Sequence, residues 1–206
     1  MESFQKQPRI KSLPAFSIYR KLKLKEIDLN EVVRTVTGVL PQHVPGNIDT
    51  KVILSEKDLK ILADMALLRE ALIHLIENAM DAMPDGGTFM LNTNRVNFEN
   101  RSIPEDSDDN YGTCAFISLA DTGTGIDEKI KERIFEPFFT TKTGTGKGLG
   151  LPIAHYIIKE HGGNMKLEST PGQGTAINVY LPLAKPEIMN IIPIPLPAPY
   201  DRNLSI

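Results

Sequence analysis

The order of apolar and polar positions predicts a chain built from both helices and strands. After Asn30, whose side chain can cap a helix, apolar residues recur at helical spacing at Val32, Val33, Val36, Val39 and Leu40. A cluster of helix-breaking residues follows at Pro41, Pro45 and Gly46. A short strand over 52–54 and a turn beginning at Asp58 are then expected to lead into a second helix over about 65–83.

The second half of the chain alternates mainly with the period of strands. Strands are expected over 88–96 and 115–121, and the polar, acidic segment between them is expected to be an exposed excursion. Asp127 can cap a short helix with Ile130 and Ile134 on its inner face. We expect the neighbouring Phe135, Phe138 and Phe139 to pack as core. A helix over 151–159 and a hairpin of strands 165–169 and 175–181 complete the pattern.

Polar residues gather on one side of the second predicted helix. Opposite its apolar stripe, five polar residues fall within an arc of roughly 100°, taking 3.6 residues per turn: Glu70, His74, Glu77, Asn78 and Asp81. Such a face by itself indicates exposure to solvent. Asn78 is nevertheless a candidate ligand, because an amide oxygen suits Mg²⁺ when phosphates supply other ligands.

A carboxylate stands at the end of one predicted strand. Period-two alternation places Asp121 on the same face as Ile117 and Leu119, where a charge needs hydrogen-bond partners. Two interpretations remain open: the carboxylate bonds to the turn that follows, or it accepts from the exocyclic amine of a purine. By the same alternation, the Thr175 hydroxyl lies at the edge of the apolar row formed by Ile177, Val179 and Leu181.

Two groups of glycines indicate a close approach of the backbone to a ligand. Gly123 and Gly125 follow Asp121, and every other residue from Gly144 to Gly150 is glycine. Neither common phosphate motif fits: a P-loop ending at Lys147 would need glycine at Thr141, and a dinucleotide motif would need glycine at 149 or 151. The free N–H groups of the helix that follows can still face an anion.

Composition narrows the function classes. The chain has 206 residues and a formal charge of -3, which gives no general attraction to nucleic acid or to an anionic membrane. The single cysteine, Cys114, excludes an internal disulfide and is expected to be packed. No apolar run reaches the length of a membrane span, so we expect a cytoplasmic chain with no membrane contact. His155 and His161 are expected to be structural.

Five motifs in order resemble the catalytic, ATP-binding domain of bacterial sensor histidine kinases: HLIENAMDAM the N box, DTGTGI the G1 box, FEPFFTTK the F box, GTGKGLGLPI the G2 box and GQGT the final glycine motif. The resemblance implies the Bergerat fold, an α/β two-layer sandwich in which helices cover one face of a mixed, mostly antiparallel sheet. It also implies a lead over 1–26, made of the end of a dimerisation helix and a linker, and the catalytic domain over 27–184. The tail over 185–206 is expected to be extended because it is rich in proline.

The resemblance assigns roles residue by residue. Asn78 would hold Mg²⁺, and Asp121 would accept from the adenine amine with Thr175 assisting through water. A lid over 127–148 would close on the phosphates, with Lys142 or Lys147 as cationic partners; Asn78 and Lys142 would support catalysis. The residues expected to bind ATP are Asn78, Asp81, Asp121, Gly123, Gly125, Ile126, Thr141, Lys142, Gly146, Lys147, Gly148, Leu149, Gly150, Leu151 and Thr175.

The implied activity is transfer of the γ-phosphoryl group of Mg·ATP to a histidine on a dimerisation domain outside this chain, with a response regulator downstream. The phosphoacceptor motif is absent from the sequence, and Ala82 replaces a basic residue found in many family kinases. His74 stands where related ATPases carry a water-activating glutamate, which favours a kinase. An ATPase, an anti-sigma serine kinase (against which the Phe-rich box argues) and a non-catalytic nucleotide-binding module remain alternatives.

Overall fold

The computed structural model describes residues 21–39, 44–97, 113–141 and 147–184. Within these ranges strands and helices alternate. The order is β1 (Lys25–Asp28), α1 (Leu29–Thr37), β2 (Ile48–Ile53), β3 (Lys60–Ala63), α2 (Met65–Asp81), β4 (Gly87–Asn97), β5 (Thr113–Asp121), the 3₁₀ turns η2 (Glu128–Ile130) and η3 (Arg133–Phe135), α3 (Gly150–Glu160), β6 (Asn164–Thr170) and β7 (Gly174–Pro182).

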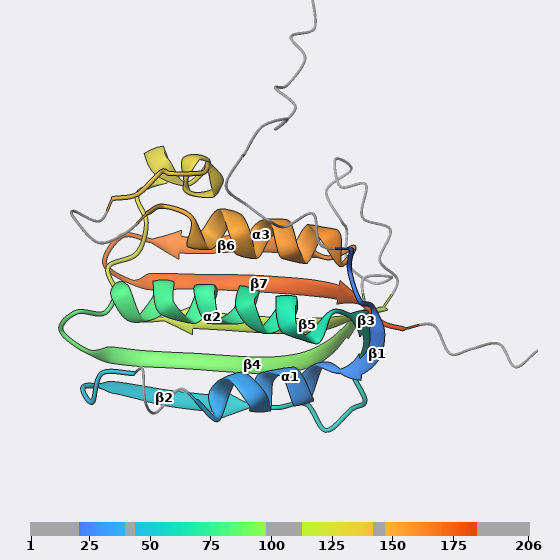
Figure 1. Ribbon diagram of the computed structural model, residues 1–206. Helices are drawn as coiled ribbons and strands as arrows, with labels where there is room; N and C mark the ends of the chain where they lie inside the picture. The colour runs from blue at the N-terminus through green and yellow to red at the C-terminus, as the bar shows by residue number, and fades with distance from the viewer. Residues whose placement is uncertain (1–20, 40–43, 98–112, 142–146, 185–206) are drawn as a thin grey trace, which may run out of the picture.

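The main sheet has five strands in the order β2-β4-β5-β7-β6. Only β2 and β4 run parallel, and the other neighbours are antiparallel. The three helices lie on one face of this sheet (Figure 1). The core forms between the two layers, where the apolar stripe of α2 meets fully buried strand residues such as Phe89, Leu91 and Val179. The expected α/β two-layer sandwich with a mixed, mostly antiparallel sheet is confirmed.

A small second sheet was not predicted from the sequence. Strand β3 occupies residues 60–63, where we expected a turn into the next helix, and it pairs antiparallel with β1. Its four residues are too few for periodicity to reveal, and its partner lies more than thirty residues away. The backbone of β3 also contacts the end of β7, because Ile61 bridges Leu183 and Ala184 N–H donates to Lys60 C=O.

The start of α1 differs from the expectation in an informative way. Asp28, not Asn30, caps the helix, and its Oδ1 accepts from the Asn30 N–H at 2.9 Å. Asn30 is 3% exposed, and its side chain accepts from Thr93 Oγ1 at 2.7 Å and donates to Ser55 C=O at 3.0 Å. The residue therefore fixes α1 to β4 and to the loop after β2. The helix ends at Thr37, and Leu40 and Pro41 lie outside the described residues.

A hydrogen-bonded clamp joins the start of α2 to the end of α3. Asp64 caps α2, and its N–H donates to His161 Nε2 at 3.0 Å. His161 Nδ1 lies 2.7 Å from the Ile157 C=O, which can only accept, so the imidazole carries its proton on Nδ1. Asp64 Oδ2 also accepts from the Lys23 N–H at 3.1 Å. His161 therefore has the structural role that we expected, and the clamp also holds the segment entering β1.

Two further expectations concern the packing of Cys114 and the presence of a membrane-spanning helix. Cys114 is fully buried in β5, as expected for a packed cysteine. Among the helices that the structure describes, none is long and apolar enough to cross a membrane.

The Asn30 contact generates a stability prediction. Thr93→Val removes one buried hydroxyl. Asn30 Oδ1 then loses its hydrogen-bond donor, and the Ser55 N–H loses its acceptor. We expect the free energy of unfolding to fall by about 1–3 kcal/mol. Thr50→Val makes the same chemical change on exposed β2 and should stay within about 0.5 kcal/mol of the parent. Urea unfolding measures both, and equal effects would show that the Asn30 contact does not stabilise the fold.

Candidate functional site

Four segments meet at one end of the sheet: the end of α2, the turn after β5, the start of α3 and the β6–β7 hairpin. Figure 1 shows the last turn of α2 and the first turn of α3 at this end. A Cβ added to Gly150 would lie 3.4 Å from Asn78 Nδ2, and one added to Gly123 would lie 2.4 Å from Ala82 C=O. The register pairs Asp121 directly with Thr175. The fold therefore brings together residues from separate parts of the sequence.

Asp121 ends the central strand β5 and is half-buried. Its Oδ1 accepts from the Gly123 N–H at 2.9 Å and from the Thr175 N–H at 3.3 Å. Burial raises the pKa of this carboxyl, and the two backbone hydrogen bonds only partly offset the rise. The bond to the following turn is thus present, but it uses one oxygen. Within the described ranges no group donates to Oδ2, so that oxygen can accept from a ligand.

The two glycines after Asp121 are required by the packing of the chain on itself. Gly125 has φ 67°, and a Cβ there would lie 2.1 Å from Thr170 C=O. At Gly123 a Cβ would strike the last turn of α2. Next along the chain, the half-buried Ile126 donates its N–H to Ser169 Oγ at 2.8 Å. The turn is therefore pressed between α2 and the hairpin, a reason for glycine that we did not anticipate.

The polar side of α2 separates into two groups. Glu70, Glu77 and Asp81 are exposed, whereas His74 and Asn78 are half-buried. The start of α3 lies over the half-buried pair, because a methyl group on Gly150 would contact both side chains. His74 Nδ1 is 3.4 Å from Glu77 Oε2. Of the five candidates on this helix, His74 and Asn78 lie beside the start of α3.

Helix α3 begins at Gly150, one residue before the predicted start, and no side chain caps it. The N–H groups of its first turn therefore keep their capacity to bind an acceptor, with the positive end of the helix dipole behind them. Gly148, at φ 64°, packs on the backbone of Phe138 and Phe139, and its C=O accepts from the Phe138 N–H at 2.9 Å. This contact fixes the approach to α3.

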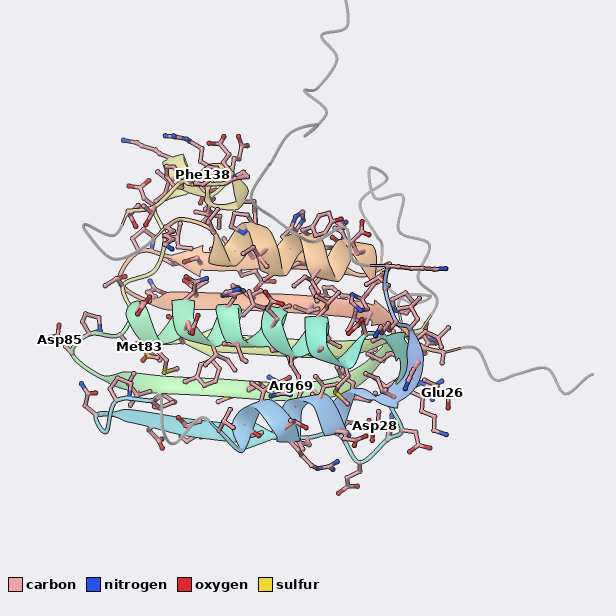
Figure 2. The ribbon with its side chains drawn as sticks, in the orientation of Figure 1. Glu26, Asp28, Arg69, Met83, Asp85 and Phe138 are labelled. Atoms are coloured by element: carbon pink, nitrogen blue, oxygen red, sulfur yellow. The ribbon has the colours of Figure 1, made fainter. Side chains whose placement is uncertain are left out.

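The Phe-rich segment corrects one expectation. Phe138 is 60% exposed and has φ 68°, so it is not core (Figure 2). Phe139 lies under the guanidinium of Arg133, 4.3 Å from ring centre to carbon, and Phe135 contacts the His155 ring. Two 3₁₀ turns replace the expected helix, and only Ile134 is buried. Asp127 does cap the first turn, as predicted. Phe135 is half-buried and packs against the core, as expected, and of the three phenylalanines only Phe138 is exposed.

The remaining residues expected to bind ATP lie in or next to the range 142–146, which is outside the described residues. Thr141 and Lys147 are exposed at its two ends, and Leu149 and Leu151 are half-buried at the start of α3. Lys142 and Gly146 lie outside the described residues.

One residue of this site was missed. Ser169, on β6, contacts Ile126, Gly174 and Thr175 through its hydroxyl. The signal was present in the sequence, because Ser169 continues the row of Met165 and Leu167 as its one polar member. A hydroxyl at the end of an apolar row indicates a polar site in the same way for Ser169 as for Thr175.

Comparison with known proteins identifies the family. The model named "Histidine kinase-, DNA gyrase B-, and HSP90-like ATPase" matches residues 63–185, more than half of the chain. The chain belongs to this family of ATPases and kinases. The match covers the elements from α2 to β7.

Relatives of similar sequence are named as bacterial kinases. Sensor kinase CckA of Brucella abortus is 34% identical over 84% of this chain and 18% of its own length, and sporulation kinase C of Bacillus subtilis is 34% identical over 79% and 35%. The chain thus spans about a third of these proteins or less. The catalytic domain of histidine kinase ThkA aligns with a TM-score of 0.62 at 30% identity, over 78% of this chain and 95% of that one.

Two other similar solved structures are complexes. Full-length ShkA in complex with AMPPNP aligns with a TM-score of 0.63 at 26% identity, over 81% of this chain and 32% of that one. ThkA in complex with the response regulator protein TrrA aligns with a TM-score of 0.60 at 29% identity, over 79% and 42%.

The raised pKa of Asp121 generates a prediction for the ligand-free protein. In Asp121→Asn the amide oxygen can still accept from Gly123 and Thr175, but no charge is buried. Because the folded-state pKa of the carboxyl is raised, the parent loses stability as pH rises from the unfolded-state pKa through the folded-state pKa. The stability of the variant minus that of the parent should therefore grow as the pH rises above about 4, the ordinary pKa of an aspartate.

Urea unfolding across that pH range measures the difference. Asp127→Asn changes an exposed capping carboxylate and controls for the loss of a surface charge. A parent that gains stability over Asp121→Asn as pH rises would contradict the burial of an unfavourable charge at this site.

Proposed function

We propose that this chain is the ATP-binding catalytic domain of a two-component sensor histidine kinase. It transfers the γ-phosphoryl group of Mg·ATP to a histidine on a dimerisation domain outside the chain. The phosphorus–oxygen bond to ADP breaks, a phosphorus–nitrogen bond to imidazole forms, and the imidazole proton is released. The observation that carries the proposal is the meeting of Asp121, Asn78 and the uncapped start of α3 in one site.

The two ends of the site would bind the two ends of the nucleotide. Asp121 accepts from the adenine amine, and Thr175 lies beside it with a hydroxyl available for a bridging water. Gly123, Gly125 and Ile126 form the turn next to the base. The phosphates extend towards Asn78 and the amides of 148–151, where the dipole of α3 favours negative charge. Phosphoryl transfer depends mainly on such positioning and charge neutralisation.

The residues present fit Mg²⁺ held largely by phosphate. Among the described residues no group of three His, Cys, Asp or Glu side chains could hold a metal by itself. Mg²⁺ needs only one or two protein ligands when phosphates and water complete its shell, and the half-buried Asn78 amide can supply one. Bound there, the ion would neutralise phosphate charge. Lys142 or Lys147 is the proposed cationic partner in the lid over 127–148, which includes Thr141 and Gly146.

Phosphoryl transfer to a histidine is favoured over hydrolysis because of His74. The related ATPases carry a water-activating glutamate one turn before the asparagine, and this chain has His74 at that position. Its neighbour Glu77 is exposed and lies against His74. The proposed partners are the dimerisation and phosphoacceptor domain of the same kinase and a response regulator. Because ATP is the donor, we place the domain in the cytoplasm, without contacts to nucleic acid or membrane.

A transfer experiment tests the proposal. The chain is incubated with γ-labelled ATP and Mg²⁺, with and without the dimerisation domain of its own kinase. Acid-labile, alkali-stable label on that domain is the expected result. Label on serine would favour an anti-sigma kinase, and steady phosphate release by the chain alone would favour an ATPase. Binding of ATP with no transfer would favour a non-catalytic module.

The metal assignment generates its own prediction. Asn78→Ala removes the amide oxygen, so the gain in ATP affinity on adding Mg²⁺ should fall about tenfold or more, the usual effect of weakening a metal site. ATP affinity measured in a chelator should change little, which separates metal loss from misfolding. Glu77→Ala, on the exposed side of the same helix turn, is the matched control. An unchanged Mg²⁺ dependence in Asn78→Ala would exclude Asn78 as the ligand.

A further inference from the structure

Ser169 lies where the turn after β5 meets the β6–β7 hairpin, and its hydroxyl has three hydrogen-bond partners. The Ile126 N–H lies 2.8 Å from Ser169 Oγ, the Gly174 C=O lies 3.0 Å away, and Thr175 Oγ1 lies 2.9 Å away. One partner is a donor, one is an acceptor, and the threonine hydroxyl can be either. The side chain is half-buried, so the protein supplies most of its surroundings.

Only one arrangement of protons satisfies all three contacts. A serine hydroxyl has one proton to donate and two lone pairs to accept with. The Ile126 N–H can only donate, and the Gly174 carbonyl can only accept. If Ser169 gave its proton to Thr175, two oxygens without a proton between them would face each other at 3.0 Å. Ser169 therefore donates to Gly174, and Thr175 must donate to Ser169.

This arrangement determines what Thr175 presents to the base. With its proton directed at Ser169, Thr175 Oγ1 has only lone pairs left. Directly across the register, Asp121 ionised is also an acceptor only. Thr175 Oγ1 and the Asp121 carboxylate therefore offer only hydrogen-bond acceptors to the base. The 6-amino group of adenine can donate to these two acceptors. The 6-oxo group of guanine or hypoxanthine is itself an acceptor, so its oxygen is repelled by them.

We propose that Ser169 is a positioning residue for purine selection: it holds the proton of Thr175 and so makes the base site select a 6-amino purine. The inference rests on the proposed function, because it assumes that adenine lies beside Asp121 and Thr175. Without the Ser169 hydroxyl, the Thr175 proton turns either to the 6-oxo group of a wrong base or to Asp121. Both changes reduce the preference for adenine.

The test compares ATP with inosine triphosphate, which differs from ATP at the 6-position and at the neighbouring N1 proton. Calorimetry gives the ratio of the two affinities for the parent and for Ser169→Ala. We expect the ratio to fall about tenfold, the factor for one neutral hydrogen bond changing partner. Ser169→Thr keeps the hydroxyl and should restore the ratio. Ser169→Cys, a weaker donor, should give an intermediate value and serves if Ser169→Ala does not fold.

A double-mutant cycle separates this role from simple support of the hairpin. If Ser169 acts through Thr175, adding Ser169→Ala to Thr175→Val should leave the affinity ratio at the value of Thr175→Val alone. Equal loss of affinity for both nucleotides in Ser169→Ala would overturn the inference and leave a merely structural residue. A parent chain that binds neither nucleotide, or both equally, would instead overturn the proposed function.

Discussion

A single carboxylate at the end of a buried strand is the constraint on which this site depends. Asp121 continues the apolar row of Ile117 and Leu119, and a charge there is costly unless it is hydrogen-bonded. The turn after β5 folds back to supply the Gly123 N–H, and the hairpin supplies the Thr175 N–H. Both glycines of that turn are needed because the backbone passes against α2 and the hairpin. The carboxylate therefore needs the N–H groups of this turn, and the turn keeps its conformation partly by bonding to the carboxylate. The remaining desolvation, seen in the raised pKa of Asp121, is a cost that a donating ligand would relieve.

The pairing of α2 with α3 organises the other half of the site. At one end of the pair, Asp64 and His161 join the start of α2 to the end of α3. At the other end, Gly150 leaves only the space of a methyl group between α3 and the Asn78 side chain. Because helices are stiff, fixing their alignment at the clamp also fixes where the first turn of α3 lies relative to Asn78. The Lys23 N–H bonds to the same Asp64. The chain entering β1 is thus held by the same residue that aligns the two helices.

Much of this architecture could be predicted from the sequence, and the failures have identifiable causes. Long periodic segments predicted α2, β5 and β7 to within about two residues at each end. Alternation placed Asp121 and Thr175 each at the end of an apolar row, and the structure shows that these two rows are paired. Strand β3 was missed because four residues carry no periodic signal and its partner is remote. The α1 cap was assigned to Asn30 from local propensity. Propensity does not reveal that the Asn30 side chain is already hydrogen-bonded to Thr93, far along the chain. Alternation along β6 marks Ser169 as the polar end of an apolar row, but its three hydrogen-bond partners lie on other segments and follow only from the fold.

The central claim is that Asp121 and Asn78 bind opposite ends of one nucleotide. A crystal structure of the chain with Mg²⁺ and a non-hydrolysable ATP analogue tests it most directly. The account predicts an adenine amine within hydrogen-bond distance of Asp121 Oδ2, and a metal ion bound by Asn78 Oδ1 and phosphate oxygens near the start of α3. A nucleotide whose base lies away from Asp121, or a metal ion held without Asn78, would contradict it.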